Sequence, residues 1–294
     1  MFARSMWLQI ISMLKLLDMA SGIAGGSIAN YTRHNFIVSA QNTTGYHFFA
    51  GVIISVYHVL STCSDLAEVS EAGVMPLENL GNVQLVAGET ITNPEQIRYP
   101  ERTYIHPACK LGPEIIQFDL AMYKVFEPWD FGGRVKPAWL PNADWVVLNS
   151  ISREMTENSE KCTIVGWGTE NTDMFLNLLE ADVELSSWAE CKKNYCKRCP
   201  NFEAANLCTK PKKKVSVCDG DQGGPIICRQ VVWGVISYPR AECGEPHYHS
   251  YARTGARTTR TWIKDISGVM SLGTALVGNL VFIILCILAQ LHVY

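Results

Sequence analysis

The sequence predicts an all-β fold, with one short helix at residues 258–266 near its C-terminal end. Short apolar runs recur along the chain, and glycine, proline or asparagine residues separate them. Their spacing and their content of β-branched residues are typical of strands in a sandwich or a barrel. The chain shows neither an internal repeat nor a low-complexity linker. Clear examples of these runs are residues 48–54, 83–86, 162–165 and 230–236.

Size and charge limit the classes of function. Two hydrophobic ends leave about 245 residues between them, which suits one large all-β domain or two small ones. The net charge of −3 is too small to indicate binding to nucleic acid. We therefore expect no nucleic-acid partner, and no motif indicates a cofactor or a metal centre.

The cysteine content indicates the secretory pathway. Eleven cysteines are too many for a reduced cytosolic chain that lacks metal-ligand spacing, so an oxidising compartment is favoured. Asn30 and Asn42 each begin an Asn-x-Thr triplet, the acceptor motif for N-glycosylation. We expect a glycoprotein that is extracellular or held at the cell surface.

Residues 1–22 have the pattern of a signal peptide. A positive residue precedes an apolar stretch, and Ala20 and Gly22 then form a small-x-small cleavage site. Cleavage after Gly22 would make Ile23 the first residue of the mature chain. The alternative is an amphipathic helix, because Lys15 interrupts the apolar stretch.

The segment 267–294 is predicted to hold the chain to a membrane. Residues 269–289 are largely apolar, and about 20 apolar residues can span a bilayer. No lysine or arginine follows this stretch, so no cytoplasmic stop signal is visible. A removable lipid-anchor signal is the alternative, with Ser267–Gly268 or Ser271 as the attachment site.

The motif that carries most information about function lies at residues 218–225, which read CDGDQGGP. It resembles the active-site segment C-x-G-D-S-G-G-P of trypsin-like serine proteases. Gln222 stands where the family has its attacking serine. A glutamine amide has no nucleophilic oxygen that a neighbouring base can activate. The motif therefore predicts the protease fold without its nucleophile.

Further landmarks follow the family's order over residues 23–266. One such match is weak, but the ordered series is strong. The resemblance implies a trypsin-like domain at residues 23–266, built of two packed six-stranded β-barrels with a cleft between them. The matching segments are 23–26 (IAGG), 51–55 (GVIIS), 59–64 (VLSTCS), 118–124 (FDLAMYK), 135–141 (VKPAWLP), 162–168 (CTIVGWG), 233–238 (WGVISY) and 262–263 (WI).

The resemblance also locates the other two catalytic positions. Ser64 occupies the place of the family's general base, a histidine, and a serine hydroxyl cannot accept a proton at neutral pH. Asp119 matches the aspartate that orients this histidine, so we expect only a residual buried acceptor. His58 is the nearest substitute base, although an ordinary strand histidine is the favoured interpretation. The family's bridge beside the base is absent, because Phe49 and Asp65 hold its positions.

Three framing residues match the family's activation apparatus. In the family, the carboxylate at Asp221 pairs with the new α-amino group after activation and shapes the oxyanion hole, together with the turn at Gly220. No arginine or lysine directly precedes Ile23, so activation by a trypsin-like cut is not encoded. Signal cleavage after Gly22 would expose the Ile23 amino group instead.

The specificity pocket departs from the family's pattern. Ser216 lies where trypsin-like enzymes carry an acidic residue, and Tyr238–Pro239 replaces Trp-Gly. A proline adds bulk and removes a backbone donor, so we expect a narrowed pocket. His247 and His249 follow where the family has Pro-Gly, and their spacing allows a metal pair, but no third ligand is visible.

The cysteines fall into implied and inferred pairs. Elimination favours a bridge between Cys63 and Cys109. Cys196 and Cys199 form either half of a zinc site or a disulfide, and the compartment favours the disulfide. The resemblance implies three further pairs, which are Cys162–Cys228, Cys191–Cys208 and Cys218–Cys243.

A basic cluster falls within a short span that contains a single acidic residue, Glu203, between its first and last members. Its functional interpretation is an exosite for an acidic protein or a sulfated glycan. The alternative is an ordinary solvated lysine-rich surface. The members are Lys192, Lys193, Lys197, Arg198, Lys210, Lys212, Lys213 and Lys214.

Together these features predict a non-catalytic serine protease homologue that acts by binding. The expected role is a scaffold, co-factor or decoy whose partner is an extracellular protease, a protease substrate or a receptor. Loss of the nucleophile and the base on a retained fold supports this class, although a fold alone names no function. The alternatives are a residual hydrolase that uses other groups, and a chaperone or trafficking factor of the secretory pathway.

Overall fold

The computed structural model describes residues 23–70, 73–77, 80–90, 93–112, 116–168, 177–195, 199–237 and 243–269. The predicted signal peptide and the apolar tail beyond Val269 lie outside these ranges. Within them, the helices are too short or too polar for any one to cross a bilayer.

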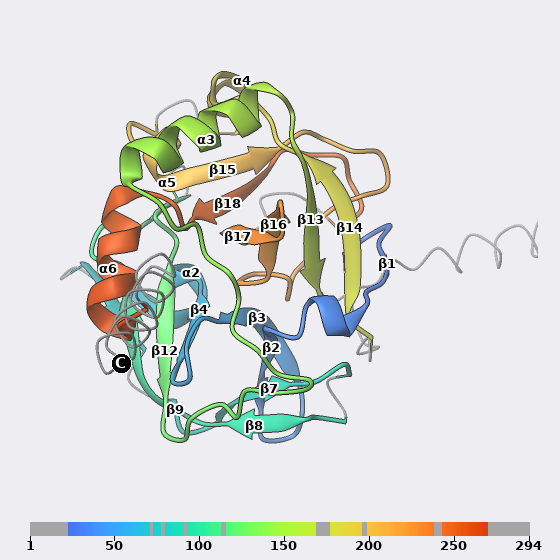
Figure 1. Ribbon diagram of the computed structural model, residues 1–294, viewed down its shortest axis with the longest axis vertical. Helices are drawn as coiled ribbons and strands as arrows, with labels where there is room; N and C mark the ends of the chain where they lie inside the picture. Colours follow the sequence, from blue (N-terminus) through green and yellow to red (C-terminus); the bar gives the residue numbers. More distant parts are fainter. Residues whose placement is uncertain are drawn as a thin grey trace, which may run out of the picture.

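The first half of the domain is a seven-stranded antiparallel sheet, seen in the lower part of Figure 1. Its strand order is β8-β7-β2-β3-β4-β12-β9. Two small hairpins accompany it, β5–β6 and β10–β11. The strands are β2 (Ile37–Asn42), β3 (His47–Ile53), β4 (His58–Ser61), β5 (Ala67–Ser70), β6 (Gly73–Pro76), β7 (Val83–Ala87), β8 (Gln96–Arg98), β9 (Pro100–Ile105), β10 (Lys110–Leu111), β11 (Ile116–Gln117) and β12 (Ala121–Val125).

The second half is another seven-stranded sheet, with the order β1-β14-β13-β16-β17-β18-β15. The strand β1 comes from the start of the described chain, so it ties the N-terminal segment to this half (Figure 1). The strands are β1 (Ser27–Ile28), β13 (Lys161–Gly166), β14 (Leu179–Glu184), β15 (Asn206–Thr209), β16 (Pro225–Cys228), β17 (Val231–Ile236) and β18 (His249–Arg253).

The all-β prediction is confirmed, but each sheet has one strand more than the six expected. The physical reason is that very short edge strands extend both sheets. β1 has two residues and β8 has three, and neither is long enough to show a period-two pattern in the sequence.

The predicted helix at 258–266 is α6, which the structure extends to Arg257–Ser267. A second long helix, α3 (Trp145–Glu157), was not predicted. Asp144 caps it by accepting a hydrogen bond from the Val146 N–H at 2.8 Å. Its buried stripe is short and polar in part, which hides the helical period. The remaining helices are η1 (Tyr31–Arg33), α2 (Cys63–Leu66), α4 (Trp188–Asn194) and α5 (Phe202–Ala205).

Two hydrophobic interiors fill the halves, and a further cluster joins them. In the joining cluster, Leu60 and Met122 of the first sheet pack with Val235 of the second and with Trp262 of α6. Asp119 lies just before β12 and Ser237 just after β17, and their side chains meet at this boundary.

Four of the expected disulfides are present. Cys63–Cys109 lies in the first half, and Cys162–Cys228, Cys191–Cys208 and Cys218–Cys243 lie in the second. Cys199 is also disulfide-bonded. Its predicted partner Cys196 lies outside the described residues, so that pairing stays a prediction.

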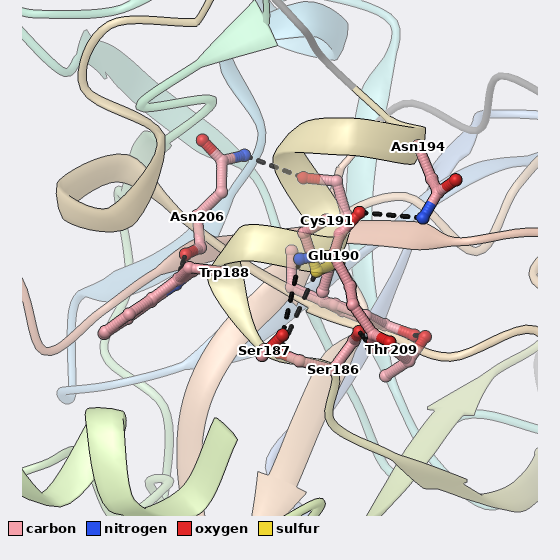
Figure 2. The surroundings of a disulfide bond; sticks show 11 residues. Ser186, Ser187, Trp188, Glu190, Cys191, Asn194, Asn206 and Thr209 are labelled. Carbon is pink, nitrogen blue, oxygen red and sulfur yellow. Dashed lines mark hydrogen bonds between the residues drawn. A yellow bond between two sulfur atoms is a disulfide. The ribbon is translucent and has the colours of Figure 1, made fainter. Parts of the chain in front are cut away.

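The Cys191–Cys208 bridge fastens α4 to β15. Figure 2 shows Trp188 and Asn206 beside it, where the indole Nε1–H donates to the Asn206 carbonyl at 2.9 Å. The Asn206 side chain donates to Ser250 Oγ at 2.7 Å. These bonds hold the two lysine-bearing segments around α4 and β15 in a fixed relation.

Candidate functional site

The centre of the site is the buried carboxylate of Asp119, which receives hydrogen bonds from both halves of the domain. Ser64 of α2 donates its backbone N–H to Oδ1 at 2.7 Å and its hydroxyl to Oδ2 at 3.0 Å. Ser237, immediately after β17, donates its hydroxyl to Oδ2 at 2.5 Å. Three hydrogen bonds donated to one carboxyl group favour its ionised form.

The predicted substitute base, His58, does not lie beside Asp119. It opens β4, where it pairs with Lys124 of β12, whereas Ser61 at the other end of β4 pairs with Ala121. Three residues along a strand span about 10 Å. The His58 ring bonds to Ser55 Oγ at 2.8 Å, and burial together with Lys124 lowers its pKa. The structure therefore gives His58 the role of a strand histidine.

Gln222 turns its side chain back onto its own loop. The Oε1 atom accepts a hydrogen bond from the Gly220 N–H at 2.6 Å, and the backbone carbonyl accepts from Ala50 N at 2.7 Å. Only 5% of the residue is exposed. In acyl-transfer sites of this kind, backbone N–H groups at this turn receive the developing oxyanion. Here the glutamine amide occupies one such donor.

The turn that carries Gln222 is pressed against the first sheet. Gly223 has a φ of +77°, and a Cβ atom there would lie 2.0 Å from the Ala50 carbonyl oxygen and 2.4 Å from Ser61 Oγ. Only glycine fits this contact without a shift of backbone. The close approach explains why the glycines of the CDGDQGGP motif are needed even with glutamine at position 222.

Behind the turn lies a histidine that sequence reasoning missed. His47 of β3 donates from Nε2 to the Gly220 carbonyl at 2.9 Å, and Nδ1 accepts from Ser39 Oγ at 2.6 Å. Burial lowers the His47 pKa to about 4, so the ring is neutral at pH 7. The sequence feature that could have indicated His47 is its position directly before the apolar run 48–54.

Asp221 is fully buried under the same turn. Its Oδ2 accepts from Cys218 N at 2.8 Å, while Oδ1 makes no hydrogen bond within the described parts of the chain. Burial raises the Asp221 pKa to about 7, and the hydrogen bond from the Cys218 N–H opposes the rise. A carboxylate in this state is unsatisfied and favours a cationic partner.

Ile23 enters the interior of the second half, where it is fully buried. It packs in the same cluster as Val217 and Ile236, and the next residue, Ala24, donates its N–H to the Ser216 carbonyl at 2.9 Å. The structure thus brings the start of the predicted mature chain beside the segment that leads to Asp221.

The predicted basic cluster is present in two described parts. Lys192 and Lys193 end α4, and Lys210, Lys212, Lys213 and Lys214 follow β15. Lys210 Nζ donates to Ser159 Oγ and Lys212 Nζ to the Asp182 carbonyl, each at 2.7 Å. The remaining two members, Lys197 and Arg198, lie outside the described residues. Lys193, Lys213 and Lys214 are exposed and free of such contacts in the hydrogen bonds described.

The possible metal ligands do not form a site. Ligand atoms of Cys63, Cys109 and Asp119 lie within 4.8 Å of one another, but the two sulfurs are joined in a disulfide and cannot act as thiolates. His247 is exposed and His249 is buried. Among the described residues, no third ligand is grouped with these two histidines.

Comparison with known proteins identifies the domain. Residues 23–263 match the family model for trypsin. The chain belongs to the trypsin family. Alpha-fibrinogenase albofibrase of Trimeresurus albolabris is 26% identical over 232 residues, which cover 76% of this chain and 80% of that protein. Kallikrein-8 of Rattus norvegicus is 27% identical over 179 residues, which cover 60% and 63%.

Solved structures share the trypsin fold with this chain. Human heparin binding protein superposes with a TM-score of 0.63 and 21% identity, over 84% of this chain and 98% of that one. Neuropsin, a serine protease from mouse brain, gives a TM-score of 0.64 and 20% identity, over 82% and 97%. At these identities the likeness shows the fold.

Within this trypsin-family frame, only part of the predicted specificity pocket lies in the described residues. Ser216 is fully buried and donates its hydroxyl to the Val217 carbonyl at 3.0 Å, while Tyr238 and Pro239 lie outside the described residues. His249 of β18, at the family's Pro-Gly segment, is 5% exposed, and burial lowers its pKa to about 4. The narrowing expected from Pro239 therefore stays a prediction.

Both predicted glycosylation sites lie in turns. Asn30 precedes η1, and its Oδ1 accepts from the Thr32 backbone N–H at 3.1 Å and the hydroxyl at 2.7 Å. Asn42 ends β2, and its Oδ1 accepts from Thr44 in the same manner. Glycosylation of these asparagines stays a prediction.

Proposed function

We propose that this member of the trypsin family is not a protease and acts by binding another extracellular protein. The observation that carries the proposal is the hydrogen bond from Gly220 N–H to Gln222 Oε1. It places an amide oxygen on a donor that catalysis would need for a developing oxyanion. Glutamine at the nucleophile's position thus supplies no attacking oxygen, and its side chain occupies a donor of the oxyanion hole.

The position of the general base supports the same conclusion. A catalytic base must reach the nucleophile and accept its proton. Ser64 instead donates its hydroxyl to Asp119, so the carboxylate orients a group that cannot act as a base. Both halves of the proton-transfer chain are replaced by stable hydrogen bonds.

A residual hydrolase would need other groups, and the best pair in the described chain is Ser39 with His47. Their 2.6 Å contact has the geometry of a nucleophile and its base. Both side chains are buried, however, with exposures of 0% and 1%. A substrate carbonyl cannot approach Ser39 without unfolding the turn at Gly220, so this alternative is disfavoured.

The basic cluster supports an acidic partner for the binding role. Four of its described lysines are exposed, and the Cys191–Cys208 bridge joins the two segments that carry them. Clustered cations attract acidic protein surfaces and sulfated glycans at long range. Human heparin binding protein, which shares the fold, is named for heparin binding. In this chain the exposed lysines support an acidic ligand. The partner is an acidic face of an extracellular protease, a protease substrate or a receptor.

We further propose that the chain enters the secretory pathway through residues 1–22 and remains membrane-attached through residues 267–294. Four disulfides fit an oxidising compartment. The apolar composition of residues 269–289 supports attachment. Phospholipase release separates a lipid anchor from a span.

The test of the inactive centre is covalent labelling. The purified chain should not react with a fluorophosphonate or cleave peptide substrates, and a trypsin-family protease serves as the positive control. The double variant Gln222→Ser, Ser64→His restores nucleophile and base and frees the Gly220 N–H, so it should gain labelling while the single variants do not. Labelling of the unmodified chain within the cleft would refute the proposal.

A further inference from the structure

We propose that an exposed apolar patch at one end of the first sheet rests on the membrane to which the C-terminal segment attaches. This tip patch consists of Val56, Tyr57, Tyr99 and Phe126. The inference depends on the membrane attachment proposed above and adds a second contact, made by the folded domain itself.

The tip patch comes from three segments of chain that lie side by side. Backbone hydrogen bonds join them: Val125 N to Tyr57 O at 2.9 Å, Phe126 N to Tyr99 O at 3.1 Å, and Trp129 N to Val56 O at 2.7 Å. The exposed fractions are 41% for Val56, 38% for Tyr57, 54% for Tyr99 and 67% for Phe126. Single exposed apolar residues need no explanation, but a contiguous group marks a contact surface.

The tip patch lies at the end of the molecule where α6 terminates. His106, just beyond the end of β9, contacts Thr259 and Trp262 in the first half of α6. Tyr99 precedes the opposite end of β9. A six-residue strand spans about 20 Å, and in Figure 1 α6 runs from the second half toward the part of the first sheet where β9 is labelled. Figure 1 shows α6 beside β12 and its neighbours.

A second set of contacts places the end of α6 in the same region. Val269 lines a groove of about 400 Å³ together with Ala138. The Ala138 N–H donates to the Ile53 carbonyl at 2.8 Å, and Ile53 ends β3 three residues before Val56. The last described residue is therefore anchored next to the strand that leads into the tip patch.

No spacer separates the folded domain from the apolar segment. Gly268 caps α6 in the left-handed conformation, and the apolar run begins with the next residue, Val269. Val269 itself packs against the domain, with Ala138 and Leu140 in the same cluster. If the apolar run enters a bilayer, the end of the domain from which it leaves must lie at the headgroups.

The surroundings of the tip patch fit a lipid interface of low net charge. Tyrosine and other aromatic residues favour the membrane–water boundary. The nearby charges form ion pairs, Lys124 with Glu101 at 2.7 Å and Arg98 with Asp130 at 3.2 Å. Arg102 and Glu127 add one charge of each sign. This balance favours zwitterionic phospholipid over a strongly anionic surface.

The experiment uses the full chain in phosphatidylcholine vesicles, with and without bromine at shallow acyl positions. Phe126→Trp adds a fluorophore in the tip patch to the eight tryptophans of the chain, so the emission and quenching of the unmodified chain are subtracted from those of each variant. Ile28→Trp is the matched control, because Ile28 is 69% exposed on β1 of the other sheet. Both sites are exposed, so both variants should fold, which equal thermal melting confirms.

We expect the full chain and both variants to float with vesicles. Phe126→Trp should shift its emission to the blue and lose intensity in brominated vesicles, since interfacial apolar groups sit about 5–10 Å into the boundary. Ile28→Trp should do neither. Flotation without selective quenching of Phe126→Trp would overturn the tip-patch proposal and leave attachment intact. Blue-shifted emission of Phe126→Trp without vesicles would show a protein contact instead and also overturn it. Failure to float would refute the attachment itself.

Discussion

Two regions of the molecule differ in how far they follow the trypsin family: the catalytic positions, and the buried site of Asp221 and Ile23 beneath them. At the centre, Ser64 and Gln222 stand at the positions that the sequence motifs assign to the base and the nucleophile, and both make internal hydrogen bonds. Beneath it, Asp221 and Ile23 are both present and fully buried. The difference teaches that the residues buried beneath the turn can be kept while those at the reacting positions change. A chain can keep the first set while the second serves packing.

The largest expected effect tests whether a new amino terminus at Ile23 pairs with the buried Asp221. In a chain that begins at Ile23, the ammonium would pair with Asp221, and Asp221→Asn should destabilise the fold by roughly 3–5 kcal/mol because it breaks a buried pair. In a chain that begins earlier, the same substitution removes an unsatisfied carboxylate and should not destabilise. N-terminal sequencing and denaturant unfolding together decide between these outcomes.

The pH dependence gives this test a second readout. Burial raises the Asp221 pKa to about 7 in the chain with preceding residues attached. An acid with a higher pKa in the folded state costs stability as pH rises from about 3.9 in the unfolded chain toward the folded value. We expect the unprocessed chain to lose stability between pH 4 and 7, and Asp221→Asn to lose less. An identical profile for both would contradict the burial argument.

The next effect concerns the contact between the turn at Gly223 and the first sheet. Gly223→Ala should destabilise by roughly 2–4 kcal/mol, because its Cβ would meet the Ala50 carbonyl in a strained conformation. Gly244→Ala is the matched control, since Gly244 has a φ of +87° but open space around it. The control should cost only the backbone strain, roughly 1–2 kcal/mol. Equal losses in thermal or denaturant unfolding would show that the turn can move away from the first sheet.

A smaller effect distinguishes the two hydroxyls on Asp119. Ser237→Ala removes a buried donor to a charged acceptor and should cost roughly 1.5–3 kcal/mol. Ser64→Ala leaves the backbone N–H in place, at a half-buried position, and should cost roughly 0.5–1.5 kcal/mol. Unfolding in urea measures both. A larger loss for Ser64→Ala would mean that the first half, and not the second, fixes the carboxylate.

The smallest effect concerns Gln222 itself. Gln222→Ala removes the acceptor of the Gly220 N–H and should cost roughly 0.5–1.5 kcal/mol. Amide hydrogen exchange at Gly220 should quicken in the variant. Unchanged exchange would mean that the side chain does not protect this donor in solution.

Much of the site could be placed from sequence, because its motifs are local. The run CDGDQGGP located Gln222 and Asp221, and the order of the landmarks located Ser64 and Asp119. The contacts of Ser237 with Asp119 and of His47 with Gly220 join residues 118 and 173 positions apart. Nothing local specifies which hydroxyl faces a distant carboxylate. The helix α3 was missed for a different reason, since its opening apolar residues are exposed and read equally well as a strand.

The hydrogen bonds at Asp119 also have a mechanical consequence. The Asp119 carboxylate accepts hydrogen bonds from Ser64 of the first half and from Ser237 of the second. It therefore joins the two halves across their boundary. Sliding one half over the other would strip a buried charge of its donors. A surface that cannot flex loses little conformational entropy when a partner docks. A ligand that spans both halves should therefore meet a rigid template, and its complex should form with little rearrangement of the backbone.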